Sequence, residues 1–270
     1  MDKEILNMEE AAELFNVSIK TFIKLLKEEK VPGRKIGREW RFSRKALIDW
    51  LSSGDSQAYS DSEGETKDFF NQVAPQWESL SKDYYDESIK TKLLDLNILK
   101  PPMTLMDLGA GSGYISRHVA PLVTKVIAVD ISVEMLKELR NKARTEGINN
   151  IETIESDGCD MPLTDSSIDV ICASMYLHHI EEPLAAFKEM YRLLKPGGNV
   201  FIADYQEHSN EDLKTKMHDL WPGFNLESIR TWASAAHFKN IKIKEIKAKN
   251  SRSNPEIKSS QTIFVLIAEK

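Results

Sequence analysis

A glycine-rich turn between two apolar segments, the second of which ends in an acid, constrains the fold of this 270-residue chain most strongly. The turn spans residues 109–113 and reads Gly-Ala-Gly-Ser-Gly, and Asp130 ends the second segment. Glycine leaves the main chain bare, so that a ligand can lie against backbone N–H groups at the start of the next helix. A carboxylate at the following strand end can accept hydrogen bonds from both hydroxyls of a ribose. The pattern therefore predicts a nucleoside cofactor.

Strand and helix patterns alternate through the larger part of the chain. We predict strands at 104–108, 125–130, 150–155, 168–173, 198–204, 241–246 and 261–268, with helices between most of them. The helix after Glu181 has a regular apolar period and ends where Pro196 and two glycines follow. Alternating units of this kind form a mostly parallel sheet with helices on both faces. The sequence therefore predicts an α/β domain whose ligand lies beyond the carboxyl ends of the central strands.

Residues 1–51 show a different pattern. Two short helical stretches come first, followed by a two-strand ribbon that turns near Gly37 and by a helix that ends near Trp50. Residues 18–45 carry ten basic and three acidic side chains, although the chain has a formal net charge of −6. This local positive charge predicts a polyanionic partner for this end of the chain. A linker at 52–66, rich in Ser, Gly and acids, separates the first domain (1–51) from a second one (67–270).

The cysteine content and the hydrophobic pattern of the chain indicate the cellular compartment in which it is expected. Cys159 and Cys172 are the two cysteines, so a disulfide framework is not indicated and a reducing compartment is expected. The first residues lack the features of a signal peptide, and no apolar run approaches the roughly 18 residues of a membrane-spanning helix. We therefore expect a cytoplasmic protein without a membrane partner.

Residues 105–114 resemble motif I of the class I S-adenosylmethionine-dependent methyltransferases, an acidic residue followed by G-x-G-x-G. Three further segments match this family in order, at 157–163, 166–171 and 194–198. The resemblance implies a seven-stranded Rossmann-like sheet with helices on both faces, S-adenosylmethionine as cofactor and S-adenosylhomocysteine as product. In the NAD fingerprint G-x-G-x-x-G the third glycine comes one residue later, and NAD binding remains the alternative.

The resemblance also implies roles for single residues. Asp107 and the glycines would cradle the methionine part of the cofactor, and Asp130 would hold its ribose. Asp157 would contact the adenine amino group, with Asp160 as the alternative, and apolar neighbours would cover the adenine faces. The predicted cofactor-binding residues are Asp107, Gly109, Ala110, Gly111, Gly113, Asp130, Ile131, Met135, Asp157, Gly158 and Ser174.

The first 51 residues resemble the excisionase-type winged helix-turn-helix module, from residues 8–12 through the segment 36–43 to Leu47 and Trp50. In that family the second helix enters a major groove of double-stranded DNA and the wing lies along phosphates. The predicted DNA-binding residues are Lys20, Thr21 and Lys24 on the helix and Arg34, Lys35, Arg38 and Arg41 on the wing. The alternative is a helix face that is merely solvated. Such modules often act in pairs, so a homodimer is plausible.

Candidate catalytic residues are His178 and His179, which follow the strand at 168–173, and Tyr85, which precedes the sheet. A histidine that titrates near neutrality can deprotonate a methyl acceptor, whereas packing or substrate contact is the alternative role. Trp77, Tyr84 and Tyr85 can form a lid over the sulfonium, because aromatic faces attract cations, and helix packing is the alternative. No metal site is predicted, since adjacent side chains point apart on a strand or helix and no carboxylate or cysteine at ligand spacing accompanies the histidines.

The class of methyl acceptor is inferred from sequence motifs that are missing from this chain. Residues 174–177 read Ser-Met-Tyr-Leu rather than the Asn/Asp-Pro-Pro-Tyr motif of DNA amino-methyltransferases. The sequence has no Pro-Cys pair, which methylation of cytosine carbon would need. It also has no set of cysteines of the kind that arsenite methylation uses. The domain resembles the group that includes menaquinone and ubiquinone C-methyltransferases. We therefore expect methyl transfer to a small-molecule acceptor by a DNA-binding fusion protein. The alternative is a transcription regulator whose second domain senses S-adenosylmethionine, S-adenosylhomocysteine or a small molecule with little turnover.

Overall fold

The computed structural model describes residues 3–15, 17, 19–28, 31–37, 39–53, 66–81, 87–210, 217–247 and 262–270. The chain divides into two compact units, Met1–Asp61 and Ser62–Lys270, each of which is described by itself. Most of the linker predicted at 52–66 lies outside the described residues. The last helix of the first unit runs to Ser53, two residues past the predicted end of that domain.

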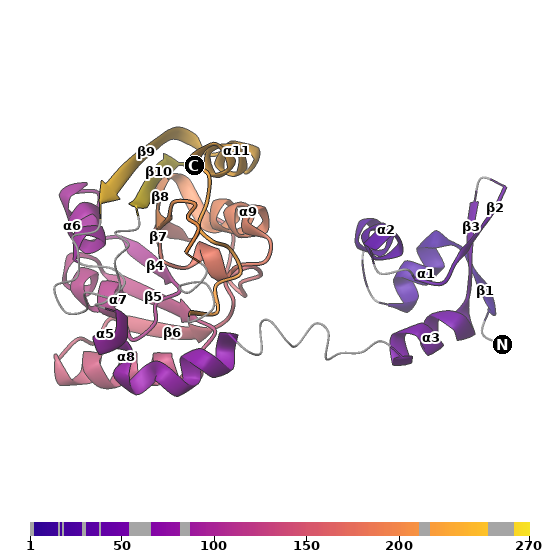
Figure 1. The fold of residues 1–270 in the computed structure, drawn as a ribbon, viewed down its shortest axis with the longest axis horizontal. Coiled ribbons are helices and arrows are strands. Elements are labelled where there is room, and N and C mark those ends of the chain that lie inside the picture. Colours follow the sequence, from indigo (N-terminus) through magenta and orange to yellow (C-terminus); the bar gives the residue numbers. More distant parts are fainter. Residues whose placement is uncertain are drawn as a thin grey trace. The chain divides into compact units, whose positions relative to one another are not determined.

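The N-terminal unit packs three helices against a small sheet (Figure 1). Its elements are β1 (Ile5–Leu6), α1 (Met8–Leu14), α2 (Ile19–Glu28), β2 (Arg34–Ile36), β3 (Glu39–Ser43) and α3 (Arg44–Ser53). Phe22, Phe42 and Leu47 are fully buried in its core. The helices and the ribbon lie where the sequence predicts them, but β1 was missed, because two residues that pair with β3 leave no periodic signal.

The larger unit is built on a seven-stranded sheet in the order β6-β5-β4-β7-β8-β10-β9. Its strands are β4 (Thr104–Leu108), β5 (Lys125–Asp130), β6 (Ile151–Glu155), β7 (Ile168–Ser174), β8 (Leu194–Tyr205), β9 (Lys239–Lys247) and β10 (Thr262–Glu269). The five strands from β4 to β8 pair in parallel, whereas β10 is antiparallel to β8 and β9. This order confirms the predicted mostly parallel Rossmann-like sheet.

Helices cover both faces of this sheet (Figure 1). One face packs against α6 (Ser88–Asp95), α7 (Tyr114–Val119) and α8 (Val133–Thr145), and the other against α9 (Pro183–Leu193) and α11 (Leu226–Ala235). Shorter elements are a helix at 66–73, η1 (Ala74–Gln76), α5 (Trp77–Ser81), η2 (Ala120–Leu122) and η3 (Leu177–His179).

Strand β4 explains why the central segments are apolar throughout. Leu105 packs into the core on one face of the sheet, whereas Met106 and Leu108 pack into the core on the other. A strand covered on both faces reads as a continuous apolar run rather than as an alternation. Asp107 interrupts this run, and its side chain is buried. A buried acid in a central strand needs a specific partner, which the site below supplies.

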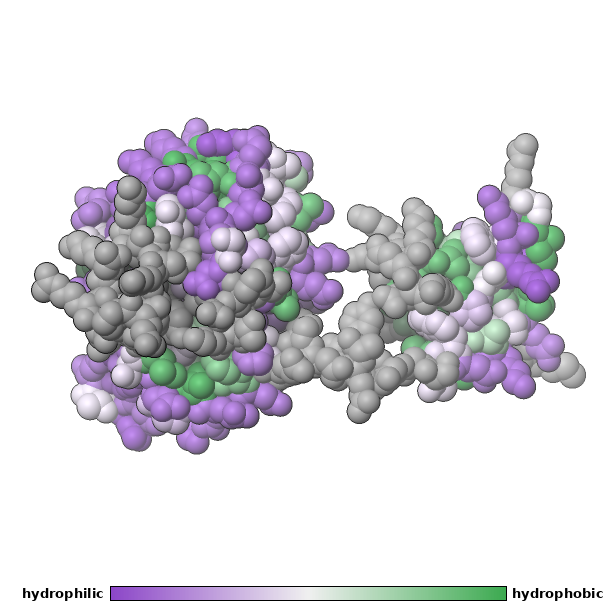
Figure 2. Space-filling view, in the orientation of Figure 1, coloured by the Kyte–Doolittle hydropathy of each residue, from purple (hydrophilic) through white to green (hydrophobic). Residues whose placement is uncertain are grey.

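The visible surface of the larger unit is mainly hydrophilic, with small hydrophobic patches between the polar regions (Figure 2). Within the part of the chain that is described, no helix combines the length and the hydrophobicity needed to cross a membrane.

Candidate functional site

The loop between β4 and α7 has left-handed backbone at three glycines, with φ of 68° at Gly109, 53° at Gly111 and 84° at Gly113. A Cβ atom at Gly109 would lie 2.9 Å from Cβ of Tyr176, and one at Gly113 would lie 2.4 Å from Cγ of Leu139. Both conformation and space therefore require glycine here. The loop exposes main chain, rather than side chains, at the carboxyl end of the central strand.

Asp130 ends β5 beside this loop. Its Oδ2 accepts a hydrogen bond from the N–H of Gly111 at 2.8 Å, and its Oδ1 accepts one from the N–H of Ser132 at 2.9 Å. These contacts fix the carboxylate, and each oxygen keeps a further lone pair. Burial raises the pKa of Asp130 to about 6, although both hydrogen bonds favour its charged form.

Asp107 lies below the glycine loop, with 1% of its surface exposed. The hydroxyl of Ser116 on α7 donates to its Oδ2 at 2.6 Å. Burial raises the pKa of Asp107 to about 7, against the lowering effect of Ser116. This hydrogen bond joins β4 to α7, the two elements on either side of the glycine loop.

Tyr176 joins the glycine loop to the loop after β6. Its hydroxyl donates to the backbone oxygen of Asp157 at 2.7 Å, and its ring occupies the space beside Gly109. A Cβ at Gly158, where φ is 84°, would lie 2.8 Å from the Tyr176 hydroxyl oxygen. The N–H of Cys159 holds the side chain of Asp157 through Oδ1 at 3.0 Å. Sequence reasoning considered Tyr176 only as part of the segment 174–179 just after a predicted strand, and its contacts with the two loops were missed.

The remaining predicted cofactor residues lie near the same edge of the sheet. Ala110 is buried, and its N–H donates to the carbonyl of Val129 at 2.9 Å. Ile131 and Ser174 are partly exposed at the ends of β5 and β7. Met135 is buried against Phe70 and its neighbours, so a direct contact with a ligand requires that packing to open. These residues stay predictions for a ligand-bound state.

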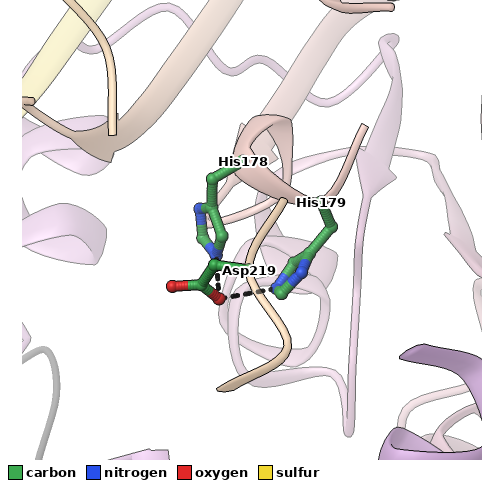
Figure 3. A group of neighbouring side chains, drawn as sticks. All are labelled: His178, His179 and Asp219. Carbon is green, nitrogen blue, oxygen red and sulfur yellow. Dashed lines mark ion pairs between the residues drawn. The ribbon is translucent and has the colours of Figure 1, made fainter. Parts of the chain in front are cut away.

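His178 and His179 lie on η3, just beyond β7, and both direct their rings toward Asp219 (Figure 3). Nε2 of His178 is 3.4 Å and Nε2 of His179 is 3.8 Å from Oδ1 of Asp219. The two ring centroids are 4.1 Å apart. The expectation that these side chains point apart without a carboxylate was wrong, because a tight 3₁₀ turn brings adjacent rings together and Asp219 arrives from a distant segment.

A second carboxylate, Asp204 on β8, holds the other side of His178. Its Oδ1 lies 2.6 Å from Nδ1 of His178, and both groups are buried. Burial disfavours the charged ring, but Asp204 and Asp219 outweigh this effect and raise the pKa of His178. Burial and the neighbouring His178 lower the pKa of His179 well below its usual value. The pair thus contains one ring that readily carries a proton and one that stays neutral.

Aromatic rings connect these histidines to the glycine loop. The ring of Phe70 is 5.1 Å from His179 and 5.3 Å from Trp77, in edge-to-face arrangements. Nε1 of Trp77 lies 3.3 Å from the position of a Cβ at Gly111. Trp77 therefore lies over the loop, consistent with either a lid or helix packing. Tyr84 and Tyr85, the other predicted lid residues, lie outside the described residues, and Tyr85 was also the predicted catalytic tyrosine.

The predicted DNA-binding residues are described only in part. Arg34 and Lys35 are exposed on β2, and Arg34 pairs in register with Arg41 on β3. The guanidinium of Arg41 also contacts Glu39 and donates to the carbonyl of Trp40 at 2.9 Å. Arg38 and the side chains of Lys20, Thr21 and Lys24 lie outside the described part of the chain.

The strand order, the glycine loop and the acids at the strand ends define the larger unit as a Rossmann-like α/β domain. Residues 106–202 match the family model described as "Methyltransferase domain", and residues 5–55 match the one described as "Helix-turn-helix domain". Over these residues the larger unit is similar to a methyltransferase domain, and the N-terminal unit is similar to a helix-turn-helix domain.

Relatives and solved structures agree with this assignment. The chain is 29% identical, over 136 residues, to a ubiquinone/menaquinone biosynthesis C-methyltransferase UbiE of Shewanella sp. (strain W3-18-1), a match that covers 49% of this chain and 54% of that protein. The chain thus spans about half the length of the curated relatives it matches. The fold is similar to a SAM-dependent methyltransferase from Aquifex aeolicus, with a TM-score of 0.55, 20% identity and coverage of 77% of this chain and 97% of that one.

A third similar protein is phosphoethanolamine N-methyltransferase 2 from Haemonchus contortus, solved in complex with phosphomonomethylethanolamine and S-adenosylhomocysteine. The TM-score is 0.59 at 19% identity, and the match covers 68% of this chain and 53% of that one. At this identity the likeness concerns the fold.

Proposed function

We propose that the larger domain transfers a methyl group from S-adenosylmethionine to a small organic acceptor. The observation that carries the proposal is the bare main chain of the glycine loop, fixed beside the carboxylate of Asp130. A ribose needs a fixed acceptor for its two hydroxyls, and the remaining lone pairs of Asp130 meet that need. The relatives named as quinone C-methyltransferases support a small-molecule acceptor.

The other strand ends supply the rest of the proposed cofactor site. The glycine loop and Asp107 beneath it cradle the methionine part, and Asp157 accepts a hydrogen bond from the adenine amino group. In this assignment Tyr176 is a positioning residue, because it fixes Gly109 and Gly158 relative to each other. Asp160, the alternative adenine contact, is exposed to solvent.

The proposed reaction is an in-line displacement at the methyl carbon. A nucleophilic atom of the acceptor forms a bond to that carbon while the carbon–sulfur bond breaks, and the electron pair stays on sulfur. The products are the methylated acceptor, S-adenosylhomocysteine and one proton. Because the sulfonium is already an activated leaving group, alignment of the two reactants can supply most of the rate, on the order of 7–11 kcal/mol of barrier. The acceptor lies beyond the ends of β7 and β8, next to His178 and His179.

Binding and turnover test the proposal separately. Isothermal titration calorimetry of the full chain with S-adenosylhomocysteine is expected to give one saturable site. Incubation with methyl-labelled S-adenosylmethionine and a cell metabolite extract is expected to label a small molecule in an enzyme-dependent manner. No binding of either compound at millimolar concentration would refute the assignment of the cofactor.

The helix-turn-helix match favours a second function for the same chain, namely binding to double-stranded DNA through the N-terminal domain. Exposed cations on the β2–β3 ribbon support it, since phosphate contacts dominate the affinity for DNA. In the sensor alternative, cofactor binding changes DNA affinity and the labelling experiment yields no product. Tight binding of S-adenosylhomocysteine without labelled product would favour this sensor over the enzyme.

A further inference from the structure

We propose that His178, His179 and Asp219 bind a divalent transition-metal ion, for which Zn²⁺ is the probe, at the carboxyl end of β7. Each side chain offers one ligand atom, and these atoms lie within 4.8 Å of one another. Imidazole nitrogens and carboxylate oxygens are ligands of zinc, iron(II) and related ions. Metal binding does not depend on the proposed methyl transfer. The catalytic role proposed for the ion does rest on the proposed function.

One of the two separations from Asp219 equals that between two ligands of one ion, and the other is 0.4 Å longer. Oδ1 of Asp219 lies 3.4 Å from Nε2 of His178 and 3.8 Å from Nε2 of His179, both beyond the usual range of about 2.7–3.2 Å for N–H···O bonds. Two tetrahedral ligands bound at about 2.0–2.1 Å lie about 3.3–3.4 Å apart. Both rings face the same oxygen (Figure 3), so a small closure of the three side chains would surround one ion.

Asp204 already orients His178 as a metal ligand. The short contact between Asp204 and Nδ1 places the proton of a neutral ring on Nδ1 and leaves the lone pair of Nε2 toward Asp219. Histidine ligands in metal sites usually donate their other N–H to a carboxylate in this way. Asp204 is itself fixed, because it accepts hydrogen bonds from the N–H groups of Leu177 at 2.8 Å and Tyr205 at 2.7 Å.

The charge of the group also favours a cation. The side chains of Asp204 and Asp219 are 0% and 1% exposed, and they lie on opposite sides of His178. Two buried carboxylates thus flank one imidazole, and a divalent cation is a charge partner suited to buried carboxylates.

The position of the site suggests the role of the ion. Phe70 contacts His179 and Trp77, and Trp77 lies over Gly111 of the proposed cofactor loop. Three protein ligands leave one coordination position open, as in catalytic zinc sites. An acceptor hydroxyl bound there has a lowered pKa and loses its proton to water. Its oxygen then attacks the methyl carbon, and the carbon–sulfur bond breaks with its electron pair on sulfur. The substrate class is an acceptor with a hydroxyl or enol oxygen.

Zinc titration of the metal-free, full-length chain tests the site. After EDTA treatment and removal of the chelator, isothermal titration calorimetry is expected to give one Zn²⁺ per chain with micromolar or tighter affinity. Co²⁺ in place of Zn²⁺ is expected to produce the visible absorption of a four-coordinate nitrogen and oxygen site. Zn²⁺ is also expected to raise the melting temperature, because it binds the folded chain.

Four substitutions distinguish Zn²⁺ binding at this site from nonspecific Zn²⁺ binding elsewhere on the chain. His179→Ala and Asp219→Asn are each expected to weaken Zn²⁺ affinity at least 100-fold and to abolish the rise in melting temperature. Asp204→Asn removes the partner that orients His178, and a 10–100-fold loss is expected. His118→Ala, at an exposed histidine of α7, is the matched control and is expected to leave the affinity unchanged.

The absence of saturable Zn²⁺ binding by the unmodified chain up to 100 µM would overturn the proposal. Equal binding by the unmodified chain, His179→Ala and Asp219→Asn would overturn it as well, and the three side chains would then form a hydrogen-bonded acid–base group only. Because the titration contains neither cofactor nor acceptor, its result is independent of the proposed function. A failure to bind S-adenosylhomocysteine alongside normal Zn²⁺ binding would refute the proposed function alone.

Discussion

Asp130 combines two properties that a ribose-binding carboxylate needs, a fixed position at a strand end and lone pairs that remain available. Asp130→Asn keeps the shape but replaces one acceptor oxygen with a donor. We expect it to weaken S-adenosylhomocysteine about 10–100-fold, since hydrogen bonds to charged groups contribute about 1.5–3 kcal/mol. Calorimetry on Asp130→Asn, with Asp165→Asn at an exposed acid as control, measures the effect. Unchanged affinity in Asp130→Asn would remove Asp130 from the cofactor site.

Asp107 makes the stability of the chain depend on pH. Burial raises its pKa to about 7 from the ordinary value of 3.8, so between these pH values the folded state holds a proton that the unfolded state releases. The contribution to stability is therefore complete below pH 3.8 and is lost as the pH rises through 7. Since one pKa unit corresponds to 1.36 kcal/mol, the loss is at most about 4 kcal/mol.

Asp107→Asn has no carboxyl group to titrate at this position. The free energy of unfolding of Asp107→Asn, relative to that of the unmodified chain, is therefore expected to increase by about 2–4 kcal/mol between pH 4.5 and pH 8. Urea denaturation of both proteins at several pH values measures this difference. A constant difference across the range would mean that Asp107 is ionised throughout.

The sequence predicts that the glycine loop and Asp130 lie side by side, as they do in the structure, because both lie at strand ends that are close along the chain. Sequence reasoning missed the contacts that Tyr176 makes with the two loops, and it missed that Asp204 and Asp219 lie beside His178. Asp204 is 26 residues from His178 along the chain, and Asp219 is 41 residues from it. Both carboxylates reach the imidazole ring of His178 only because the folded chain passes back across the sheet. Contacts made by tertiary packing leave no periodic signal in a single sequence.

At the scale of elements, two glycines with left-handed backbone differ in how strictly their surroundings require glycine. Gly113 has a left-handed φ, and a Cβ there would overlap Leu139 of α8. Gly147 is also left-handed, but nothing lies within 4 Å of its Cβ position. We expect Gly113→Ala to destabilise the chain by about 2–4 kcal/mol and Gly147→Ala by about 1 kcal/mol. Chemical denaturation measures the loss of stability in each variant. Equal losses would show that α8 moves enough to accommodate the added methyl group at residue 113.

The strands were predicted well because both faces of the sheet are covered, which makes the central segments apolar. The start of β8 was placed too late, at residue 198 instead of Leu194. Proline and glycines interrupt the apolar pattern there, yet Leu194 pairs with Ile168 across an irregularity of the ladder. A bulge of this kind continues a strand through residues that predict a turn.

At the scale of the whole molecule, the proposed DNA binding is expected to depend steeply on salt. Four to six phosphate contacts predict a slope of about −4 to −5 in a plot of log affinity against log salt. Removal of two exposed cations by Arg34→Ala with Lys35→Ala is expected to make the slope shallower by about 1.8. Fluorescence anisotropy with duplex DNA at several salt concentrations measures this slope. Lys239→Ala, in the larger domain, is the control and is expected to leave the slope unchanged. A slope that stays at its original value would exclude phosphate contacts by these two residues.

Among the described residues each unit has its own hydrophobic core, around Phe22 and Phe42 in the first unit and around the large sheet in the second. Coupling between two ligands requires that each binds one global state better than another. Because the cores are separate, we expect saturating S-adenosylhomocysteine to change DNA affinity less than threefold. Anisotropy titrations with and without S-adenosylhomocysteine measure this ratio. A change of tenfold or more, about 1.4 kcal/mol of coupling, would instead favour the sensor, since an enzyme that is only tethered to DNA has no need to transmit cofactor occupancy.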